Sequence, residues 1–191
     1  MPDTPANPVG HPGRLEVICG PMFAGKTTEL LRRLAEAHAG GQRVVAFKPI
    51  LDRRYADAAI VSHAGVQSPA RAVGTAAEIL GLVRDEAVVG IDEAHFFGAP
   101  LAEACSSLLR RRTRVIVAGL ERDHFGNPFE PFPALLCDAD EVLKLSGPCA
   151  ACGRPAIHSQ RMVDTPGRIV VGGAEMYEAR CRECFRPASS A

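Results

Sequence analysis

The chain reads Gly20-Pro21-Met22-Phe23-Ala24-Gly25-Lys26-Thr27 between an apolar segment, Leu15 to Cys19, and a pattern of helical spacing. This stretch fits G-x-x-x-x-G-K-[ST], the phosphate-binding loop that joins a strand to a helix. Its glycines allow the backbone to curl around an anion, with N–H groups turned inward at the positive end of the helix. We expect Lys26 to reach the outer phosphates of a nucleotide and the Thr27 hydroxyl to take one position on a magnesium ion.

A glycine-bearing turn with a chance lysine is the alternative interpretation of this motif. The residues from Glu29 to His38 place apolar side chains near helical spacing, and Gly40-Gly41 is typical of a helix end. This context favours the phosphate loop.

Length and charge narrow the class of protein. A chain of 191 residues can form one main domain with at most a small appendage. Lys plus Arg and Asp plus Glu both number 22, so no basic field favours nucleic acid, and a small-molecule partner is expected. The proline-bearing leader, residues 1–13, lacks the apolar core of a signal peptide, and no stretch approaches the ~20 apolar residues of a membrane span. We expect a soluble, cytoplasmic protein with no membrane partner.

Apolar runs and helical patterns alternate after the phosphate loop. Thr75 and Glu78 have the capping-box spacing that begins a helix, and the polar stretch from Leu51 to Pro69 predicts a loop or hairpin. Such βαβ alternation is typical of a parallel sheet with helices on both faces. The expected strands are 43–48, 87–91, 114–118 and 141–145, the last as a core strand, and the expected helices are 75–84 and 99–111.

An acidic pair, Asp92-Glu93, follows the apolar strand that ends at Ile91. In a phosphate-loop protein this is the Walker B element, whose aspartate holds magnesium, so Asp92 is expected on the metal side. Glu93 can point toward a reacting hydroxyl or water and act as general base. A helix N-cap is the alternative role for such a pair, and the phosphate loop makes it the weaker one.

Asp92-Glu93-Ala94-His95 also spells the signature of a helicase class. Those motors close ATP between two domains and need a basic track for nucleic acid, and this chain has neither the length nor the charge for that. His95 is then either a neighbour of the nucleotide or of Glu93, or a structural histidine.

Four of the seven cysteines form two C-x-x-C pairs, Cys149 with Cys152 and Cys181 with Cys184. Two such pairs supply the four thiolates of a tetrahedral zinc site, which has no open position and is therefore structural. Iron and disulfides are the alternatives. The single cysteines, Cys19, Cys105 and Cys137, are expected as small buried hydrophobes.

Several of these motifs occur together in one known family. They are the phosphate loop with Gly-Pro-Met-Phe before Ala-Gly-Lys-Thr, both cysteine pairs, and the segments 92–97, 117–120, 127–129 and 171–178. Together they resemble the zinc-containing, cellular cytosolic type of thymidine kinase, over about residues 15–184. The resemblance implies a P-loop-type parallel sheet flanked by helices, with a small C-terminal zinc-binding subdomain that carries a lasso-like lid. The expected divisions are a leader 1–13, an ATP-binding domain 14–146, the zinc subdomain 147–186 and a tail 187–191.

The resemblance implies transfer of the γ-phosphoryl of ATP to the 5′-hydroxyl of thymidine, with Glu93 as the catalytic base and with Mg²⁺ and structural Zn²⁺. It also implies a homotetramer. The residues then expected to bind the nucleotide are Gly20, Pro21, Met22, Phe23, Ala24, Gly25, Lys26, Thr27, Arg54, Asp92, Glu93, Ala94 and His95. Those expected at the nucleoside are Met22, His124, Phe125, Ser159, Arg168, Ile169, Val170, Val171, Gly172 and Tyr177.

Two positions depart from the family pattern. The family commonly has glutamine where this chain has His95, and an aromatic residue that contacts the base falls here on His124, with Phe125 displaced by one position. Either His124 or Phe125 is expected to make that contact. Two functions of other classes remain as alternatives: a nucleotide-gated binding module, and a nucleic-acid-stimulated ATPase with a zinc ribbon.

Overall fold

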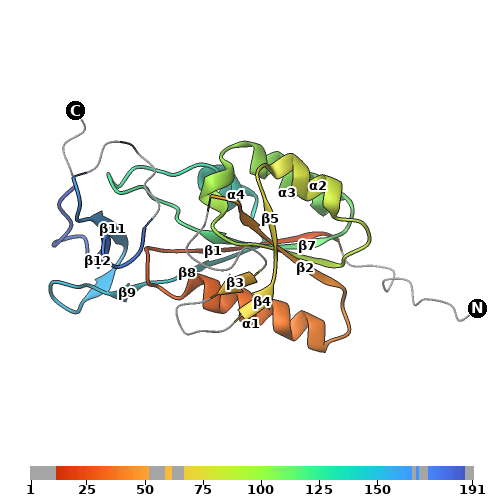
Figure 1. Ribbon diagram of the computed structural model, residues 1–191, viewed down its shortest axis with the longest axis horizontal. Helices are drawn as coiled ribbons and strands as arrows, with labels where there is room; N and C mark the ends of the chain where they lie inside the picture. The colour runs from red at the N-terminus through yellow and green to blue at the C-terminus, as the bar shows by residue number, and fades with distance from the viewer. Residues whose placement is uncertain (1–11, 52–58, 62–66, 165–166, 168–171, 188–191) are drawn as a thin grey trace, which may run out of the picture.

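The computed structural model describes residues 12–51, 59–61, 67–164, 167 and 172–187. Its centre is a six-stranded sheet in the order β5-β2-β6-β7-β1-β8, in which every neighbouring pair is parallel (Figure 1). In that order the strands are Arg71–Val73, Val44–Pro49, Val88–Ile91, Arg114–Gly119, Arg14–Cys19 and Glu141–Lys144. Because all six strands run the same way, their carboxyl ends meet at one edge, where open α/β sheets bind ligands.

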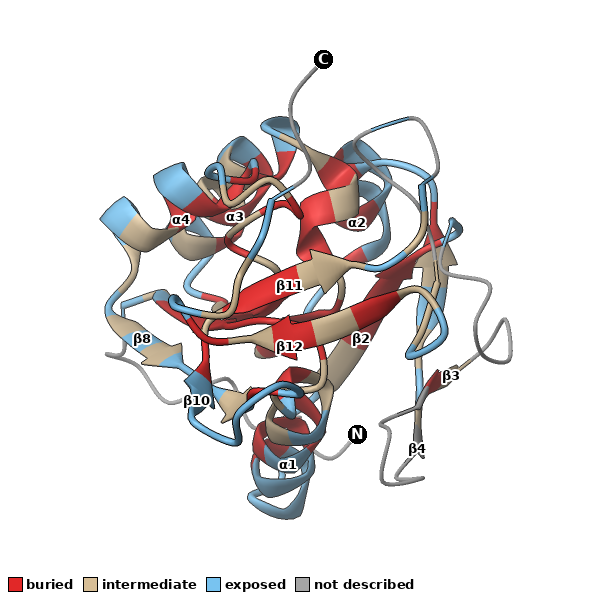
Figure 2. Cartoon of the chain, turned by 90° about the vertical axis from the view of Figure 1, so that its left-hand side faces the viewer, coloured by how far each residue is buried: buried red, intermediate tan, exposed pale blue. Residues whose placement is uncertain are grey.

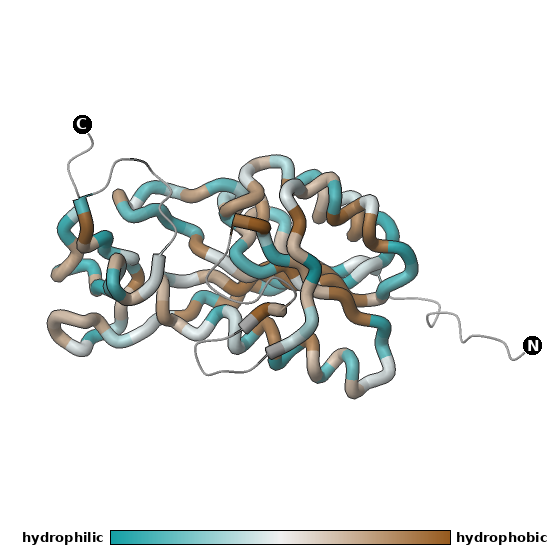
Figure 3. The backbone as a smooth tube through the Cα atoms, viewed as in Figure 1, coloured by the Kyte–Doolittle hydropathy of each residue, from teal (hydrophilic) through white to brown (hydrophobic). Residues whose placement is uncertain are grey.

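Helices cover both faces of the sheet (Figure 1). Helix α1 (Lys26–Ala39) packs on one face with Leu30, Leu31 and Leu34, and Ile60 of the short hairpin β3–β4 (Ala59–Val61 and Gln67–Pro69) belongs to the same cluster. The other face carries α2 (Ala76–Leu82), the short 3₁₀ helix η1 (Ala94–Phe97), α3 (Pro100–Arg110) and α4 (Phe132–Asp138). The central strands carry hydrophobic residues (Figure 3) and are largely buried (Figure 2), so the core lies between the sheet and these helices.

A smaller unit follows β8 and lies beyond one end of the sheet (Figure 1). It consists of two antiparallel two-stranded sheets. The first pairs β9 (Gly147–Pro148) with β10 (Pro155–Ala156), and the second pairs β11 (His158–Arg161) with β12 (Tyr177–Arg180). Its small core is formed by Cys149, Ala156, Ala179 and Cys181.

The predicted α/β fold with a parallel sheet is confirmed, and most element boundaries agree within two residues. Thr75 caps α2 as predicted, because its Oγ1 accepts from the Glu78 N–H at 3.3 Å, but the Glu78 carboxylate accepts from the Gly74 N–H at 3.2 Å and not from that of Thr75, as a capping box would have it. The stretch after Leu51 contains the predicted hairpin.

Two predictions were wrong. Strand β8 is not a core strand, because it forms one edge of the sheet and leaves Val142 46% exposed. Cys137 is not a buried hydrophobe, because α4 turns Phe132 and Leu135 toward the sheet and leaves Cys137 exposed. Cys19 and Cys105 are buried as expected.

Most of the proline-bearing leader and the end of the tail fall outside the described residues. Among the described helices, none combines the length and the apolar character that a membrane span requires.

Candidate active site

The phosphate loop joins β1 to α1 and has the backbone conformation that its glycines allow. Gly25 caps α1 in the left-handed region with φ 87°, and Phe23 also has a positive φ of 63°. A side chain at Gly20 would place its Cβ 2.4 Å from the carbonyl oxygen of Leu145, so the close approach of these two segments requires glycine. Lys26 is buried, and its Nζ donates to the carbonyl of Pro21 at 2.7 Å. The loop therefore curves around its own lysine, as a phosphate cradle does.

The two halves of the predicted nucleotide site are in contact. Thr27 Oγ1, at the start of α1, lies 3.1 Å and 3.3 Å from the carboxylate oxygens of Asp92, which follows β6. Asp92 is 5% exposed, and its Oδ1 also accepts from the backbone N–H of Glu93 at 3.0 Å. A hydroxyl and a carboxylate that meet at the mouth of a phosphate loop are the oxygen ligands that a hard divalent cation prefers, so these residues fit one.

The electrostatics at Asp92 also fit a cation. Burial, and secondarily the negative charge of Glu93, raise the pKa of the Asp92 carboxyl to about 7, although Thr27, the Glu93 N–H and Lys26 favour its charged form. A cation between these oxygens would lower the pKa of Asp92 again, because a nearby positive charge favours the ionised carboxyl.

Glu93 stands where the chain turns from β6 into η1. Its backbone is left-handed, with φ 47° and ψ 43°, which is uncommon for a residue with a side chain and recurs at functional sites. Its carboxylate is 16% exposed, and Oε2 lies 3.6 Å from Nδ1 of His95. A base in this position can be reached by a substrate while most of its surface is shielded from water.

A buried contact connects the small unit to the phosphate loop. Ser159, on β11, is 4% exposed, and its Oγ accepts from the backbone N–H of Met22 at 3.0 Å. Ser159 pairs with Ala179 and Arg161 with Tyr177, so Ser159 and Tyr177 lie on the same face of this two-stranded sheet. Three of the predicted nucleoside residues, Met22, Ser159 and Tyr177, are thereby brought to one region.

The segment after β7 is organised by Asp123. Its Oδ1 accepts from the backbone N–H groups of Phe125 and Asn127 at 3.0 Å and 2.9 Å. His124 is 4% exposed and Phe125 is half-buried, and their ring centroids are 3.8 Å apart. The two rings form one pair, and which of them contacts a base stays a prediction.

His158 and Phe185 connect this segment to the small unit. Their rings stack with centroids 4.2 Å apart and an interplanar angle of 5°. A Cβ at Gly126 would lie 3.2 Å from Phe185 Cε1 and 3.9 Å from His158 Nδ1, so the segment after β7 packs against this pair. Neither residue was predicted from the sequence, in which the only signals are their positions beside Ser159 and Cys184.

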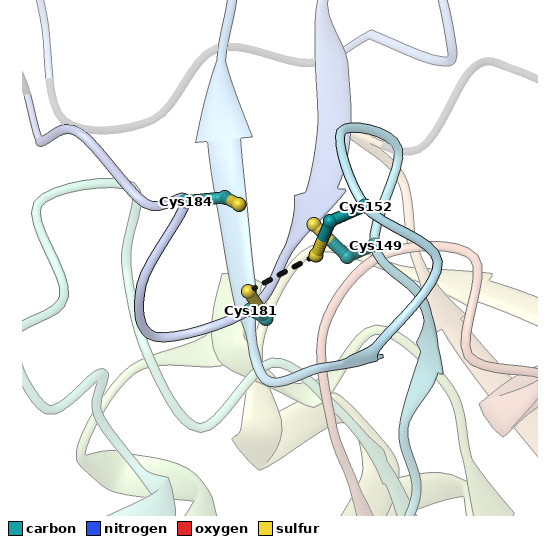
Figure 4. A group of neighbouring side chains, drawn as sticks. All are labelled: Cys149, Cys152, Cys181 and Cys184. Carbon is teal, nitrogen blue, oxygen red and sulfur yellow. Dashed lines mark hydrogen bonds between the residues drawn. The ribbon is translucent and has the colours of Figure 1, made fainter.

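The four paired cysteines converge, as Figure 4 shows. Their sulfur atoms all lie within 4.8 Å of one another, and the sulfurs of Cys152 and Cys181 are 3.6 Å apart. A disulfide would need about 2.05 Å, and all seven cysteines, every one of which is described, are free. Zn–S bonds of about 2.3 Å in a tetrahedron put sulfurs about 3.8 Å apart, so the cluster fits a zinc ion.

The pKa values of these thiols are shifted in opposite directions. Hydrogen bonds from backbone groups, first that of Cys181, lower the pKa of Cys149 to about 6. Interactions with the neighbouring sulfurs, first those of Cys152 and Cys181, raise the pKa of Cys184 to about 12. Each thiolate thus makes the ionisation of the next thiol less favourable. Four thiolates this close together therefore need a cation to balance their charge.

Some predicted site residues lie outside the described residues: Arg54, Arg168, Ile169, Val170 and Val171. Gly172 is described, and a Cβ there would lie 2.1 Å from the sulfur of Met176, so this segment packs closely on itself. Of the predicted lasso, the described parts are the strands β11 and β12 and the residues next to them.

The family model and the most similar relatives all point to one family. The family model described as thymidine kinase matches residues 13–185. A thymidine kinase of Rhodothermus sp. is 49% identical over 178 residues, which cover 93% of this chain and 84% of the relative. The thymidine kinases of Coprothermobacter proteolyticus and Chloroflexus aurantiacus are 49% and 44% identical, and the matches cover 88% and 96% of their lengths.

Proposed function

Because the chain belongs to the thymidine kinase family, we propose that it is an ATP-dependent thymidine kinase, which transfers the γ-phosphoryl group of ATP to the 5′-hydroxyl of thymidine. The observation that carries the proposal is the contact between Thr27 and Asp92 with Glu93 next in the chain. At one edge of the sheet, it brings together a loop that fits phosphates, a carboxylate that fits a cation, and a candidate base.

Each of these residues then has a role. The N–H groups of the phosphate loop and the ammonium of Lys26 hold the phosphates of ATP. Thr27 and Asp92 would hold magnesium, whose positive charge would neutralise the outer phosphates of ATP. Glu93 accepts the proton of the 5′-hydroxyl as that oxygen attacks the γ-phosphorus, and ADP leaves with the bridging oxygen. Arg54 is proposed to bind the phosphates as well.

The nucleoside is proposed to lie between the phosphate loop and the small unit. Met22 and Tyr177 offer apolar walls, Ser159 holds Met22 in place, and either His124 or Phe125 supplies an aromatic face. The remaining residues proposed at this pocket are Arg168, Ile169, Val170, Val171 and Gly172. A lid formed by this part of the chain would exclude water, which a kinase needs in order not to hydrolyse ATP.

The zinc ion proposed at the four cysteines is structural. Four thiolates complete its tetrahedral coordination, so it offers no open position for substrate. Its role is to fix the ends of the segment from Gly153 to Arg180. The division into an ATP-binding domain 14–146 and a zinc subdomain 147–186 is part of the same proposal, as is a homotetramer, which light scattering on the purified protein tests.

The direct test is a nucleoside kinase assay. Purified protein with ATP and magnesium should convert thymidine to its monophosphate, detected by chromatography, and should convert purine nucleosides far more slowly. The same assay with single-stranded DNA at low salt tests the alternative ATPase function. Release of phosphate that single strands stimulate, with no thymidine monophosphate, would contradict the kinase.

A further inference from the structure

The turn that follows β7, residues 121–129, begins between the two halves of the proposed nucleotide site. Strand β7 pairs with β6, which ends at the acidic pair, and with β1, which ends at the phosphate loop. The chain then leaves the sheet and returns, because the Phe129 N–H donates to the carbonyl of Glu121 at 3.0 Å, and Arg122 and Pro128 form an antiparallel bridge. We call this segment the β7 turn.

The base of the β7 turn is fixed on two sides. On one side the backbone N–H of Leu120 donates to Nδ1 of His95 at 3.3 Å. On the other side Oε1 of Glu121, whose side chain is 6% exposed, lies 3.1 Å from Nζ of Lys144 at the end of β8. The turn therefore starts from a point that three neighbouring segments hold in place.

One side chain, that of Asp123, closes the β7 turn. Asp123 is 3% exposed, and its Oδ1 accepts from the N–H groups of Phe125 at 3.0 Å and Asn127 at 2.9 Å. Its own N–H donates to the Asn127 carbonyl, and its carbonyl accepts from the Gly126 N–H, both at 3.0 Å. Two of these four bonds come from the side chain, so the residue type at this position decides how well the turn is ordered.

The two aromatic rings lie within this closed part of the chain. His124 stands between Asp123 and Phe125, and its ring centroid is 3.8 Å from that of Phe125. The direction of a side chain follows from the conformation of its backbone. Because the bonds of Asp123 fix the backbone on both sides of His124, they also fix the direction of the two rings.

We propose that Asp123 is a positioning residue for the nucleoside: by closing the β7 turn, it holds the pair of His124 and Phe125 in the orientation in which one of the rings contacts the base. The inference rests on the proposed function, in which that pair supplies an aromatic face to thymidine. A ring that is already ordered costs little entropy when the base binds. The effect should therefore appear in the binding of thymidine and not in the binding of ATP.

Two variants of Asp123 test the acceptor. Asp123→Ala removes it, whereas Asp123→Asn keeps an oxygen in the same place that can accept from both N–H groups. We expect the KM for thymidine to rise about tenfold in Asp123→Ala and to stay within about threefold of the wild type in Asp123→Asn. In both variants kcat and the KM for ATP should change by less than about twofold.

Asp85→Ala is the matched control. The Asp85 side chain is 70% exposed and pairs with Arg43 before the amino end of β6, far from the carboxyl edge of the sheet, so its loss should leave both KM values unchanged. An unchanged KM for thymidine in Asp123→Ala would overturn the inference, as would an equal rise in Asp123→Asn. A rise of both KM values with a lower melting temperature would also overturn it, because Asp123 would then only stabilise the fold.

Gly126→Ala provides a second test that leaves the Asp123 side chain in place. Gly126 has a φ of 89°, and a Cβ there would lie 3.2 Å from Cε1 of Phe185, so alanine strains the same turn. We expect the KM for thymidine to rise and the KM for ATP to stay the same. An unchanged KM for thymidine would overturn the inference even if Asp123→Ala failed to fold.

Titration calorimetry with thymidine alone separates this inference from the proposed function. If the protein binds thymidine but phosphorylates no nucleoside, the kinase function fails, and weaker binding by Asp123→Ala still supports the role of Asp123. If the protein phosphorylates thymidine and Asp123→Ala binds it as tightly as the wild type does, the function stands and the role of Asp123 is overturned. A wild type that binds no thymidine would overturn both.

Discussion

The Ser159 hydroxyl accepts a hydrogen bond of 3.0 Å from the backbone N–H of Met22, across 137 residues of sequence. Met22 belongs to the phosphate loop and Ser159 to the unit that carries the four cysteines. The contact is buried on both sides, so the shape of the phosphate loop depends on a strand next to the four paired cysteines.

Ser159→Ala should therefore affect both stability and substrate binding. It leaves the Met22 N–H buried without an acceptor, which costs about 1–3 kcal/mol. We expect a lower melting temperature by calorimetry and a raised KM for thymidine. Ser107→Ala is the matched control, because the Ser107 hydroxyl bonds on the exposed surface of α3, and it should leave both quantities unchanged. Equal effects of the two variants would show that the Ser159 contact is unimportant.

Glu93→Gln should lower turnover while the nucleotide still binds. The amide keeps the size of the side chain but is no base, so kcat should fall by roughly 10²- to 10⁴-fold. Isothermal titration with ATP and magnesium should give an affinity within a few-fold of the wild type, because the phosphate loop, Thr27 and Asp92 are intact. Glu103→Gln, on the exposed side of α3, is the control. Full activity of Glu93→Gln would remove Glu93 from the mechanism.

The cysteine cluster predicts one zinc ion per chain. Elemental analysis should find it in the wild type and in Cys137→Ser, whose thiol is exposed and outside the cluster, but not at full occupancy in Cys152→Ser. Chelation should lower the melting temperature, because the metal ties the two C-x-x-C pairs together. It should also raise the KM for thymidine, because Phe185, next to Cys184, stacks on His158 beside Ser159. Iron in place of zinc, or no metal at all, would contradict this assignment.

The parts of the site that the sequence predicted are those whose residues are close together in the chain. The phosphate loop, the acidic pair after β6 and each C-x-x-C pair have fixed spacings because one turn must present several groups to one ligand. The long buried strands were also predictable, since β2, β6 and β7 are almost continuous apolar runs.

The parts that the sequence did not predict depend on tertiary contacts. No spacing links Ser159 to Met22, or His158 to Phe185, and nothing near His95 indicates that its Nδ1 would accept a hydrogen bond from the backbone N–H of Leu120. Strands as short as β9 and β10 have no recognisable pattern, since two residues show no period. The predicted burial of Cys137 was wrong because the residue type alone does not tell which side of α4 faces the sheet.

The burial of Asp92 predicts a cost in stability that depends on pH. Burial and the neighbouring Glu93 raise its pKa to about 7, whereas an aspartate in the unfolded chain titrates near 4. A carboxyl whose pKa is raised by folding destabilises the folded state when it ionises. The cost is therefore absent below about pH 4, grows as the pH rises to about 7, and is constant above that value.

Asp92→Asn should accordingly melt at a higher temperature than the wild type at pH 8 in the presence of EDTA. The difference should correspond to at most a few kcal/mol, because the amide cannot accept as many hydrogen bonds, and it should vanish as the pH falls toward 4. ATP with magnesium should stabilise the wild type more than the variant, since the cation favours the ionised carboxyl. Asp164→Asn, on the exposed surface, should show neither effect. A variant that is less stable than the wild type at pH 8, or a difference that does not depend on pH, would contradict this prediction. Either result would mean that the protein alone stabilises the ionised carboxyl of Asp92, without a cation.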